Sequence, residues 1–350
     1  MGQGEGQRHA TLRTVAQLAG VDVSTASRVL NGTSEDARRA ASREKADEIR
    51  RVAEELNYRS NPHAASLRTR RTKLIGVIVP RLSDLVLATI YEGIEDAATR
   101  LGLSTFVMNS HDEPREQKAR TEVALSRRVD GLIFGDAHID GRFIDEIAER
   151  RIPFALVNRR AGNHPSVTCD DYLGGRLVAE HFLELGHERV AVIAGEPYAS
   201  TGIDRTAGFR DRYREAGIRL PSSRIVHSHF DAAGGRQAAE QLLRGRTRPT
   251  AVFAVNDFAA IGVLGTLRDH GLRPGKDVAV AGFNDTPLAR ELPVPLTTVR
   301  SPMHEMGGLA VDLLVRLLDG EQVKSERLAP DLVVRASTDP ARLSPVATDL

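Results

Sequence analysis

Three side chains near the N-terminus, Val23, Ser24 and Arg28, have types and spacing that suit contact with DNA bases. They lie in the segment 22–31, where apolar residues recur every three or four positions, as is typical of a short helix. Asp22 is placed to cap this helix, which leaves the three side chains on its outer face. An Arg guanidinium can donate two hydrogen bonds to guanine, and a Ser hydroxyl can bond with several bases. The chemistry that these residues offer is recognition of base edges in the major groove.

A second short helix is predicted directly before this one. Thr14 can cap it, its apolar residues fall three and four positions apart, and Gly20 ends it. Two short helices about a tight turn form a helix-turn-helix unit, whose second helix enters the major groove. An ordinary helical hairpin has the same pattern, so that alternative stays open for the motif taken alone.

The helix-turn-helix segment resembles the DNA-binding headpiece of the LacI/GalR family of transcriptional regulators. The resemblance rests on the run 19–25 and on Ser27–Gly32, and it extends from about Leu12 to Thr338. Asp22 and Ala26 stand where the family usually has Ser and Val. The resemblance implies DNA contacts for seven headpiece residues: Thr14, Val23, Ser24, Thr25, Ser27, Arg28 and Asn31.

A third helix is expected to complete the headpiece, which spans residues 11–59. Ser42 is placed to cap this helix, and its apolar residues continue to Leu56. The linker before it, Thr33–Ala41, is longer than is usual in the family. We expect the additional residues to form a loop or an extra helical turn.

The next segment, 60–72, is basic and contains a Pro-started helical turn. In the family this segment is a hinge helix that enters the minor groove, where an apolar side chain wedges between base pairs and bends the duplex. A flexible basic linker is the alternative. The resemblance implies DNA contacts here for Tyr58, Asn61, Ala64, Leu67 and Arg68.

From Leu74 onwards, buried strands alternate with helices in two successive runs. Such alternation predicts two doubly wound parallel sheets. Periplasmic sugar-binding proteins, which the family's effector domain resembles, have the same architecture. The expected fold class is therefore α/β: an N-terminal three-helix, helix-turn-helix domain followed by two doubly wound parallel-sheet subdomains, as in type I periplasmic binding proteins.

The chain is expected to cross between the two subdomains more than once. In the family it crosses back after a segment like Pro295–Arg300, so a helix over 302–318 should pack on the first subdomain. A last strand over 330–335 should then return to the second. The resulting boundaries are 73–169 with 300–328 for the N-subdomain, and 170–299 with 329–340 for the C-subdomain.

Polar or aromatic side chains that follow the buried strands are the candidates for binding a small molecule, because open α/β sheets bind ligands at the carboxyl ends of their strands. The resemblance implies that matching positions bind sugar hydroxyls or purine edges. Asp257 is favoured as a helix cap instead. Leu85–Leu87 stands where relatives often have an aromatic pair, so a more apolar or modified molecule is as admissible as a sugar. The expected effector contacts are Asp84, Asn158, Thr201, Arg205, Phe230, Asn256, Asn284 and Asp285.

Composition restricts the remaining functions. The net charge of +1 is uneven, because residues 8–73 hold 14 Lys and Arg against 8 Asp and Glu, which suits a domain that meets phosphate. The single cysteine, Cys169, excludes an internal disulfide and a cysteine-built metal site. Motifs for catalysis, nucleotide binding or metal binding are absent, so we expect no catalytic residue, no metal and no cofactor. No membrane span or secretory signal is recognisable, which favours the cytoplasm.

These patterns together predict a dimeric, sequence-specific DNA-binding regulator, most simply a repressor, whose affinity for double-stranded operator DNA depends on a small-molecule effector. A solute-binding protein would explain residues 74–350 equally well, but it leaves residues 14–73 without a role. An α/β enzyme would need a catalytic constellation that the sequence lacks. Activation in place of repression, and tightening in place of release by the effector, remain open alternatives.

Overall fold

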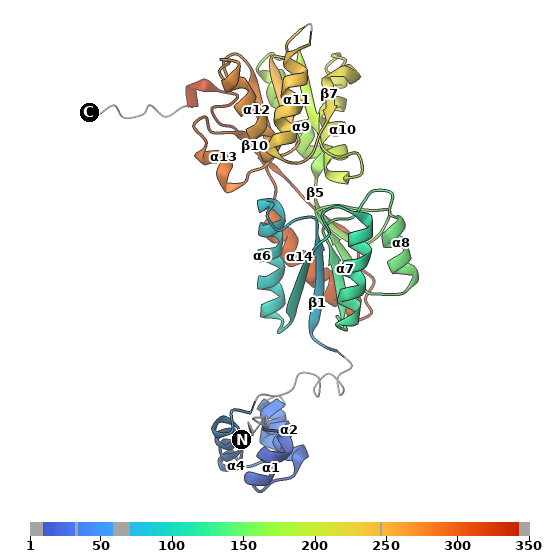
Figure 1. The fold of residues 1–350 in the computed structure, drawn as a ribbon, viewed down its shortest axis with the longest axis vertical. Coiled ribbons are helices and arrows are strands. Elements are labelled where there is room, and N and C mark those ends of the chain that lie inside the picture. Colours follow the sequence, from blue (N-terminus) through green and yellow to red (C-terminus); the bar gives the residue numbers. More distant parts are fainter. Residues whose placement is uncertain (1–9, 32–33, 59–70, 246, 343–350) are drawn as a thin grey trace, which may run out of the picture. The chain divides into compact units, whose positions relative to one another are not determined.

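The computed structural model describes residues 10–31, 34–58, 71–245 and 247–342. The chain divides between Lys73 and Leu74 into two compact units (Figure 1). Each unit has its own buried apolar core.

Four helices form the described part of the first unit: α1 (Leu12–Leu18), α2 (Val23–Asn31), α3 (Ser34–Ala40) and α4 (Arg43–Glu55). The three expected helices are α1, α2 and α4, and their core includes Val15, Ala26 and Ile49. Ser42 caps α4 as predicted, because its Oγ accepts a hydrogen bond from the backbone N of Lys45 at 3.3 Å. The longer linker forms a short helix, α3, in addition to the three that were expected.

The start of α1 differs from the prediction. Thr11 is the N-cap, since its Oγ1 accepts a hydrogen bond from the backbone N of Thr14 at 3.2 Å. Thr14 lies inside the first turn, so the prediction that it caps the helix was wrong; two threonines three residues apart both suit a cap. Asp22 does cap α2, by accepting a hydrogen bond from Ser24 N at 2.8 Å, and Gly20 forms the intervening turn with a φ of +61°.

The second unit contains two six-stranded sheets, which confirms the predicted α/β class. The first sheet has the order β11-β5-β4-β3-β1-β2 and the second has the order β12-β10-β9-β8-β6-β7. All strand pairs are parallel except β10 with β12. The first sheet consists of β1 (Leu74–Val79), β2 (Ser104–Asn109), β3 (Gly131–Phe134), β4 (Phe154–Val157), β5 (Ser166–Cys169) and β11 (Glu326–Leu328). The second consists of β6 (Val190–Ala194), β7 (Ile225–His227), β8 (Ala251–Ala254), β9 (Ala279–Asn284), β10 (Thr297–Arg300) and β12 (Asp331–Val333).

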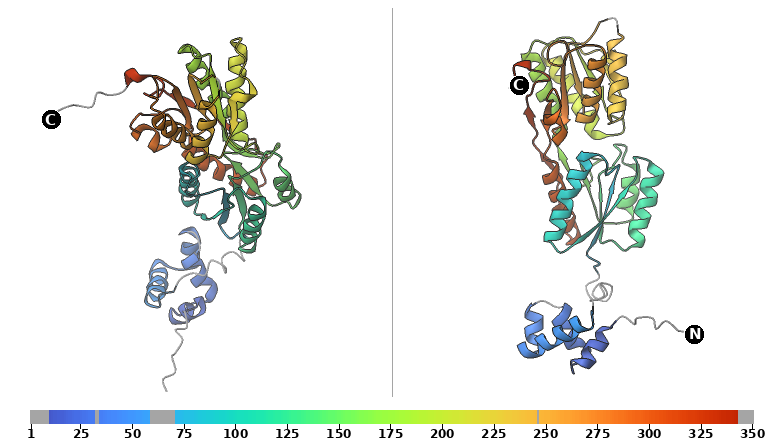
Figure 2. Two further views of the ribbon diagram at one scale, coloured as in Figure 1. Left: turned by 45° about the horizontal axis from the view of Figure 1, so that its top comes forward. Right: turned by 60° about the vertical axis from the view of Figure 1, so that its left-hand side comes forward.

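Helices flank both sides of each sheet, as the two views in Figure 2 show. The helices of the first sheet are α6 (Leu85–Arg100), α7 (Pro114–Ser126), α8 (Arg142–Glu149) and α14 (Met303–Leu318). The helices of the second are α9 (Asp171–Glu184), α10 (Ser200–Glu215), α11 (Ala232–Leu243), α12 (Asp257–Asp269) and α13 (Pro287–Glu291).

The chain crosses between the sheets three times: after β5, after β10 and after β11. α14 therefore packs against α6 and the first sheet, and β12 returns to the second sheet, as the sequence predicts. In Figure 1, α14 is the orange-red helix among the blue-green elements of the first sheet. The strand membership supports the proposed N-subdomain of 73–169 with 300–328 and the proposed C-subdomain of 170–299 with 329–340.

Three helix pairs approach so closely that only glycine fits at the crossing. A Cβ atom at Gly93 of α6 would lie 2.0 Å from the backbone O of His304 on α14, and one at Gly307 of α14 would lie 2.0 Å from that of Ile90 on α6. The pairs α9–α10 and α11–α12 cross in the same way. Their glycines are Gly175, Gly208, Gly235 and Gly262. Each crossing fixes two helices rigidly against each other within one subdomain.

Among the described residues, none of the helices has both the length and the apolar content needed to cross a bilayer. The same part of the chain contains no cluster of three or more His, Cys, Asp or Glu side chains that could hold a metal ion. Cys169 is buried and unpaired.

Candidate nucleic-acid interface and ligand cavity

The predicted reading helix, α2, presents its polar face to solvent. Val23, Ser24 and Arg28 are exposed, whereas Ala26 and Val29 are buried in the core of the first unit. The side chain of Arg28 makes no ion pair within the described part of the chain, so its donors are available. This arrangement places two donors and an apolar group on one accessible helix face, as base recognition requires.

Other predicted DNA contacts differ in accessibility. Asn31 is exposed at the end of α2, while Thr25 and Ser27 are half-buried on the same helix. Thr14 is half-buried at the start of α1, and Tyr58 packs against the core of the first unit. Four predicted contacts of the hinge segment lie outside the described residues: Asn61, Ala64, Leu67 and Arg68.

A cavity of about 630 Å³ lies between the two subdomains, where the strands of both sheets end. Its walls come from both subdomains, with Pro80 and Asp84 on one side and Phe230 and Asn256 on the other. The structure brings seven of the eight predicted effector contacts to these walls: Asp84, Asn158, Thr201, Arg205, Phe230, Asn256 and Asn284.

Arg205 is the most strongly held of these side chains. Its Nε donates to Asp171 Oδ1 at 2.8 Å, and its Nη1 donates to the backbone O of Val255 at 2.7 Å. The guanidinium carbon lies 3.7 Å from the centre of the Phe283 ring, a cation–π contact. Burial raises the pKa of Asp171 to about 6, against the opposing effect of the Arg205 charge. The second terminal nitrogen of Arg205, Nη2, has no hydrogen bond among the described residues.

Asn256, and not Asp257, caps the helix that follows β8. Asn256 caps α12, since its Oδ1 accepts a hydrogen bond from Ala259 N, and its Nδ2 donates to the backbone O of Phe230. Asn256 therefore positions Phe230 within the cavity wall. Asp257 does not cap the helix, which corrects the prediction: its carboxylate is buried and accepts hydrogen bonds from Thr286 and Thr298.

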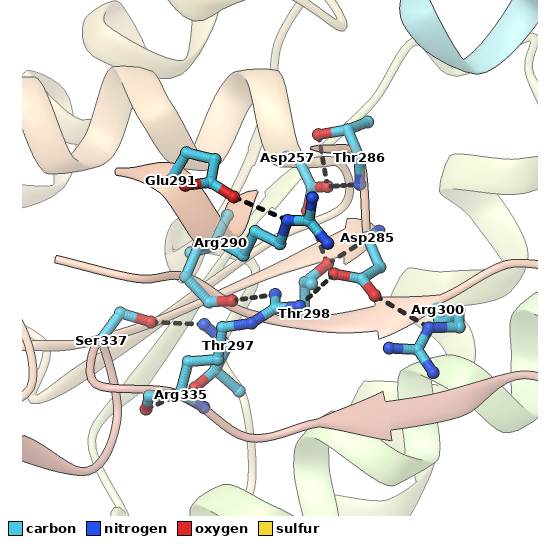
Figure 3. A network of polar contacts seen from close by, with 11 residues as sticks. Asp257, Asp285, Thr286, Arg290, Glu291, Thr297, Thr298, Arg300, Arg335 and Ser337 are labelled. Atoms are coloured by element: carbon cyan, nitrogen blue, oxygen red, sulfur yellow. Dashed lines mark hydrogen bonds and ion pairs between the residues drawn. The ribbon is translucent and has the colours of Figure 1, made fainter. Parts of the chain in front are cut away.

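Asp285 does not line the cavity, so we no longer include it among the proposed effector contacts. Its Oδ1 accepts a hydrogen bond from Arg335 Nη2 at 2.6 Å, and its Oδ2 accepts one from Arg300 Nε at 2.9 Å (Figure 3). Arg300 ends β10, whereas Arg335 follows the antiparallel strand β12 and lies beside the start of β10, so one carboxylate links residues from both ends of β10. The spacing of Asp285 after β9 suggested a ligand contact because sequence does not show where a side chain points.

This carboxylate clamp should contribute to stability. The Asp285 side chain is only 9% exposed. An Asp285→Ala variant should therefore lose about 2–3 kcal/mol of the free energy of unfolding, because Arg335 loses its charged partner. The matched variant Arg300→Ala should lose less than about 1 kcal/mol, because that side chain is 56% exposed. Chemical denaturation of the full chain measures both. Equal losses of stability in the two variants would show that the ion pair between Asp285 and Arg335 adds nothing to the free energy of unfolding.

Sequence reasoning missed a group of residues that connects the two subdomains across the cavity. Arg159 is buried and forms a bidentate ion pair with Asp112 at 2.6 and 3.0 Å, and its guanidinium carbon lies 5.8 Å from the centre of the Tyr198 ring. His138 stacks on Tyr198 at 4.2 Å. Burial lowers the pKa of His138, which favours its neutral form. Arg159 follows the predicted contact Asn158 directly, so its position after β4 was the available signal.

A second ion pair lies next to this group and also joins the subdomains. Arg160 Nη2 donates to Asp204 Oδ1 at 2.7 Å, and the backbone N of Arg160 donates to Ser200 Oγ at 3.0 Å. Arg160 belongs to the loop after β4, whereas Ser200 and Asp204 belong to α10. α10 also carries Thr201 and Arg205, so this contact ties a helix that lines the cavity directly to the other subdomain.

The first unit carries an accessible helix-turn-helix, and the second is a two-subdomain α/β domain with a polar cavity at the ends of its strands. This combination defines the class of ligand-responsive DNA-binding regulators.

Comparison with known proteins agrees with this class. Residues 11–61 match the bacterial regulatory proteins of the lacI family, and residues 179–338 match the periplasmic binding protein-like domain. The HTH-type transcriptional regulator DegA of Bacillus subtilis is 33% identical over 337 residues, which cover 94% of this chain and 98% of DegA. The ribose operon repressor of Haemophilus influenzae is 31% identical over 334 residues, which cover 94% of this chain and 98% of that repressor.

Solved structures are similar over the same length. The lac repressor dimer bound to operator and the anti-inducer ONPF has a TM-score of 0.86 and 29% identity, with 95% of this chain and 99% of that chain covered. The complex of the transcriptional regulator CelR with cellobiose has a TM-score of 0.71 and 29% identity, with 94% and 99% covered. The chain belongs to the lacI family of bacterial regulatory proteins, and it is a DNA-binding transcriptional regulator.

Proposed function

We propose that this regulator is a repressor that binds a pseudo-palindromic operator as a homodimer, and that a small molecule in the cavity changes its affinity for the operator. One short recognition helix reads too few base pairs for strong discrimination, which favours two copies on one symmetric site. A protein with this role works where the chromosome is, in the cytoplasm.

The observation that carries this proposal is the joining, in one chain, of an exposed recognition helix and a cavity walled by two separate subdomains. A ligand between two subdomains can change their relative orientation, because it contacts both walls. Segment 60–72, which we propose as the hinge helix, connects the N-subdomain to the headpiece and would transmit this change. By thermodynamic reciprocity, a ligand that weakens operator binding must bind less tightly to the DNA-bound protein.

The decisive experiment is selection of genomic DNA fragments by the purified protein, followed by sequencing. We expect a shared pseudo-palindrome, and the selection should change when the small-molecule fraction of a cell extract is added. A chain that starts at Leu74 is the control, since it lacks the first unit. Equal enrichment of fragments by both proteins would contradict the proposal.

Arg28 provides a test of the recognition helix. An Arg28→Ala variant should bind the selected operator about 1–3 kcal/mol more weakly, because it loses hydrogen bonds to base edges, and it should bind scrambled DNA nearly as well as before. The measurement is the ratio of operator affinity to scrambled-DNA affinity at a fixed salt concentration.

Arg51→Ala is the matched control within the same unit. Arg51 lies on α4 and pairs with Glu55, so its loss removes the same charge without touching α2. We expect its affinity ratio to equal that of the parent protein. An unchanged ratio for Arg28→Ala would remove Arg28 from the proposed reading residues.

A further inference from the structure

One buried polar atom in the cavity wall has no partner. Asn284, at the end of β9, is 2% exposed and lines the cavity, and its Nδ2 makes no hydrogen bond with any described residue. A buried amide nitrogen without an acceptor destabilises the protein, so such a group in a binding cavity indicates an acceptor that arrives with a ligand.

The orientation of the Asn284 amide follows from its neighbour. Arg205 Nη1 lies 3.4 Å from Asn284 Oδ1, and a guanidinium has only N–H donors. The amide oxygen must therefore face Arg205, which leaves the nitrogen as the group without a partner. Nη2 of Arg205 is also without a hydrogen bond among the described residues, so two neighbouring side chains both offer donors.

Three carboxylates of the C-subdomain near these donors do not line the cavity, and each has partners of its own. Asp171 is held by Arg205, Asp257 accepts hydrogen bonds from Thr286 and Thr298, and Asp285 is bound by Arg335 and Arg300 outside the cavity walls. Thr201, whose hydroxyl can donate or accept, lies with the donors on the C-subdomain wall. The two carboxylates of that wall have partners of their own, since Glu196 bonds with the His229 ring and Asp231 accepts a hydrogen bond from the backbone N of Gly234. We call Thr201, Arg205 and Asn284 the donor cluster.

The opposite wall offers an acceptor. Asp84 of the N-subdomain lines the cavity, and only its Oδ1 is engaged, by the backbone N of Val86 at 2.9 Å. Its other oxygen can accept a hydrogen bond from a ligand hydroxyl. The cavity therefore offers hydrogen-bond donors at the donor cluster and an acceptor at Asp84.

We propose that the effector is a hydroxylated small molecule that presents an oxygen without hydrogen, a carboxylate or a carbonyl, to the donor cluster, and that Asn284 selects this group. This inference rests on the proposed effector-binding role of the cavity and specifies its chemistry. A hydroxyl at the same position would also accept, but its hydrogen would face donors, so acids and carbonyl compounds should be preferred over alcohols.

Small probes test the donor cluster without knowledge of the natural effector. Acetate, acetone and ethanol carry a carboxylate, a carbonyl and a hydroxyl, and all three are far smaller than the 630 Å³ cavity. Each is titrated into the full-length protein labelled with ¹⁵N-asparagine, and the NMR signal of the Asn284 side-chain amide is followed. We expect acetate, acetone or both to shift this signal, with dissociation constants at least about tenfold lower than for ethanol. The comparison of acetate with acetone distinguishes a charged effector from a neutral one.

Two variants test whether the Asn284 amide is responsible for the binding of the probes. Asn284→Asp replaces the donor by an acceptor, so binding of acetate should weaken by about 10- to 100-fold. Asn163→Asp is the matched control, because Asn163 lies in an exposed turn outside the cavity walls and should leave all three constants unchanged. If Asn284→Asp does not fold, Thr201→Val tests the same cluster through another side chain, and it should weaken acetate binding by about tenfold.

Ethanol binding as tightly as acetate and acetone would overturn the proposal, and so would the absence of a shift with all three probes. The experiment contains no DNA, so its failure leaves operator recognition intact. Failure of the genomic selection, with probes that still bind, would instead remove the proposed regulatory function.

Discussion

An Arg205→Ala variant should lose its response to the effector and about 3–5 kcal/mol of its free energy of unfolding. The substitution leaves Asp171 buried without its positive partner and removes the hydrogen bond to the Val255 carbonyl oxygen. Operator affinity without effector should stay close to that of the parent, because the recognition helix belongs to the other unit. Chemical denaturation, and operator binding with and without the small-molecule fraction of a cell extract, measure these effects.

The loss of stability should depend on pH. Burial already raises the pKa of Asp171 from 3.8 to about 6, and without Arg205 the pKa should rise further. An acid whose pKa is higher in the folded state destabilises the fold above that pKa, and the penalty shrinks as the pH falls towards the unfolded value. The variant should therefore recover part of its lost stability at about pH 5.

A second substitution, Asp171→Asn, provides the control. Combined with Arg205→Ala, it should abolish this pH dependence, since the asparagine does not ionise. An Arg205→Ala variant that still responds to the effector would show that the cavity assignment is wrong.

A single methyl group at Gly307 should destabilise the protein by about 3 kcal/mol or more, whereas the same group at the neighbouring Gly308 should be neutral or stabilising by up to about 1 kcal/mol. A Cβ at Gly307 would lie 2.0 Å from the backbone O of Ile90 and 2.8 Å from the backbone N of Ile94, so α6 and α14 would have to separate. At Gly308 the nearest atom is 3.9 Å away, and alanine favours the helix over glycine.

Thermal or chemical unfolding of Gly307→Ala and Gly308→Ala compares the two positions on one helix. The change in composition is identical, so a difference between them reports the helix crossing alone. Equal stabilities would contradict the close approach of α6 and α14.

The sequence predicted the fold well where patterns are local. Alternating strands and helices indicated two parallel sheets, and apolar spacing placed Ala26 and Val29 inward with Arg28 outward. The sequence did not distinguish a loop from a short helix in the linker before α4, since the polar residues of α3 suit both. Periodicity determines which face of an element is buried, and that information lies within a few neighbouring residues.

The sequence predicted where the cavity lies, but it did not predict the contacts that individual side chains make there. Asn158 and Asp285 each follow a strand directly, yet Asn158 lines the cavity and Asp285 binds Arg335 and Arg300. The difference depends on Arg335, which is 50 residues away in the sequence, so no local pattern contains it. Asn256 and Asp257 are both good caps, and the partners that hold the Asp257 carboxylate, Thr286 and Thr298, are distant in the sequence.

The three crossings between the subdomains have a consequence for synthesis on the ribosome. The first sheet starts at Leu74, but its edge strand β11 (Glu326–Leu328) and the helix α14 (Met303–Leu318), which packs on one of its faces, come near the end of the chain. A nascent chain that ends before residue 303 therefore exposes the apolar faces of α6 and of the central strands, which α14 covers in the finished protein. Neither subdomain can complete its fold before nearly the whole chain has been translated, so these apolar faces stay open to aggregation for most of the time that synthesis takes.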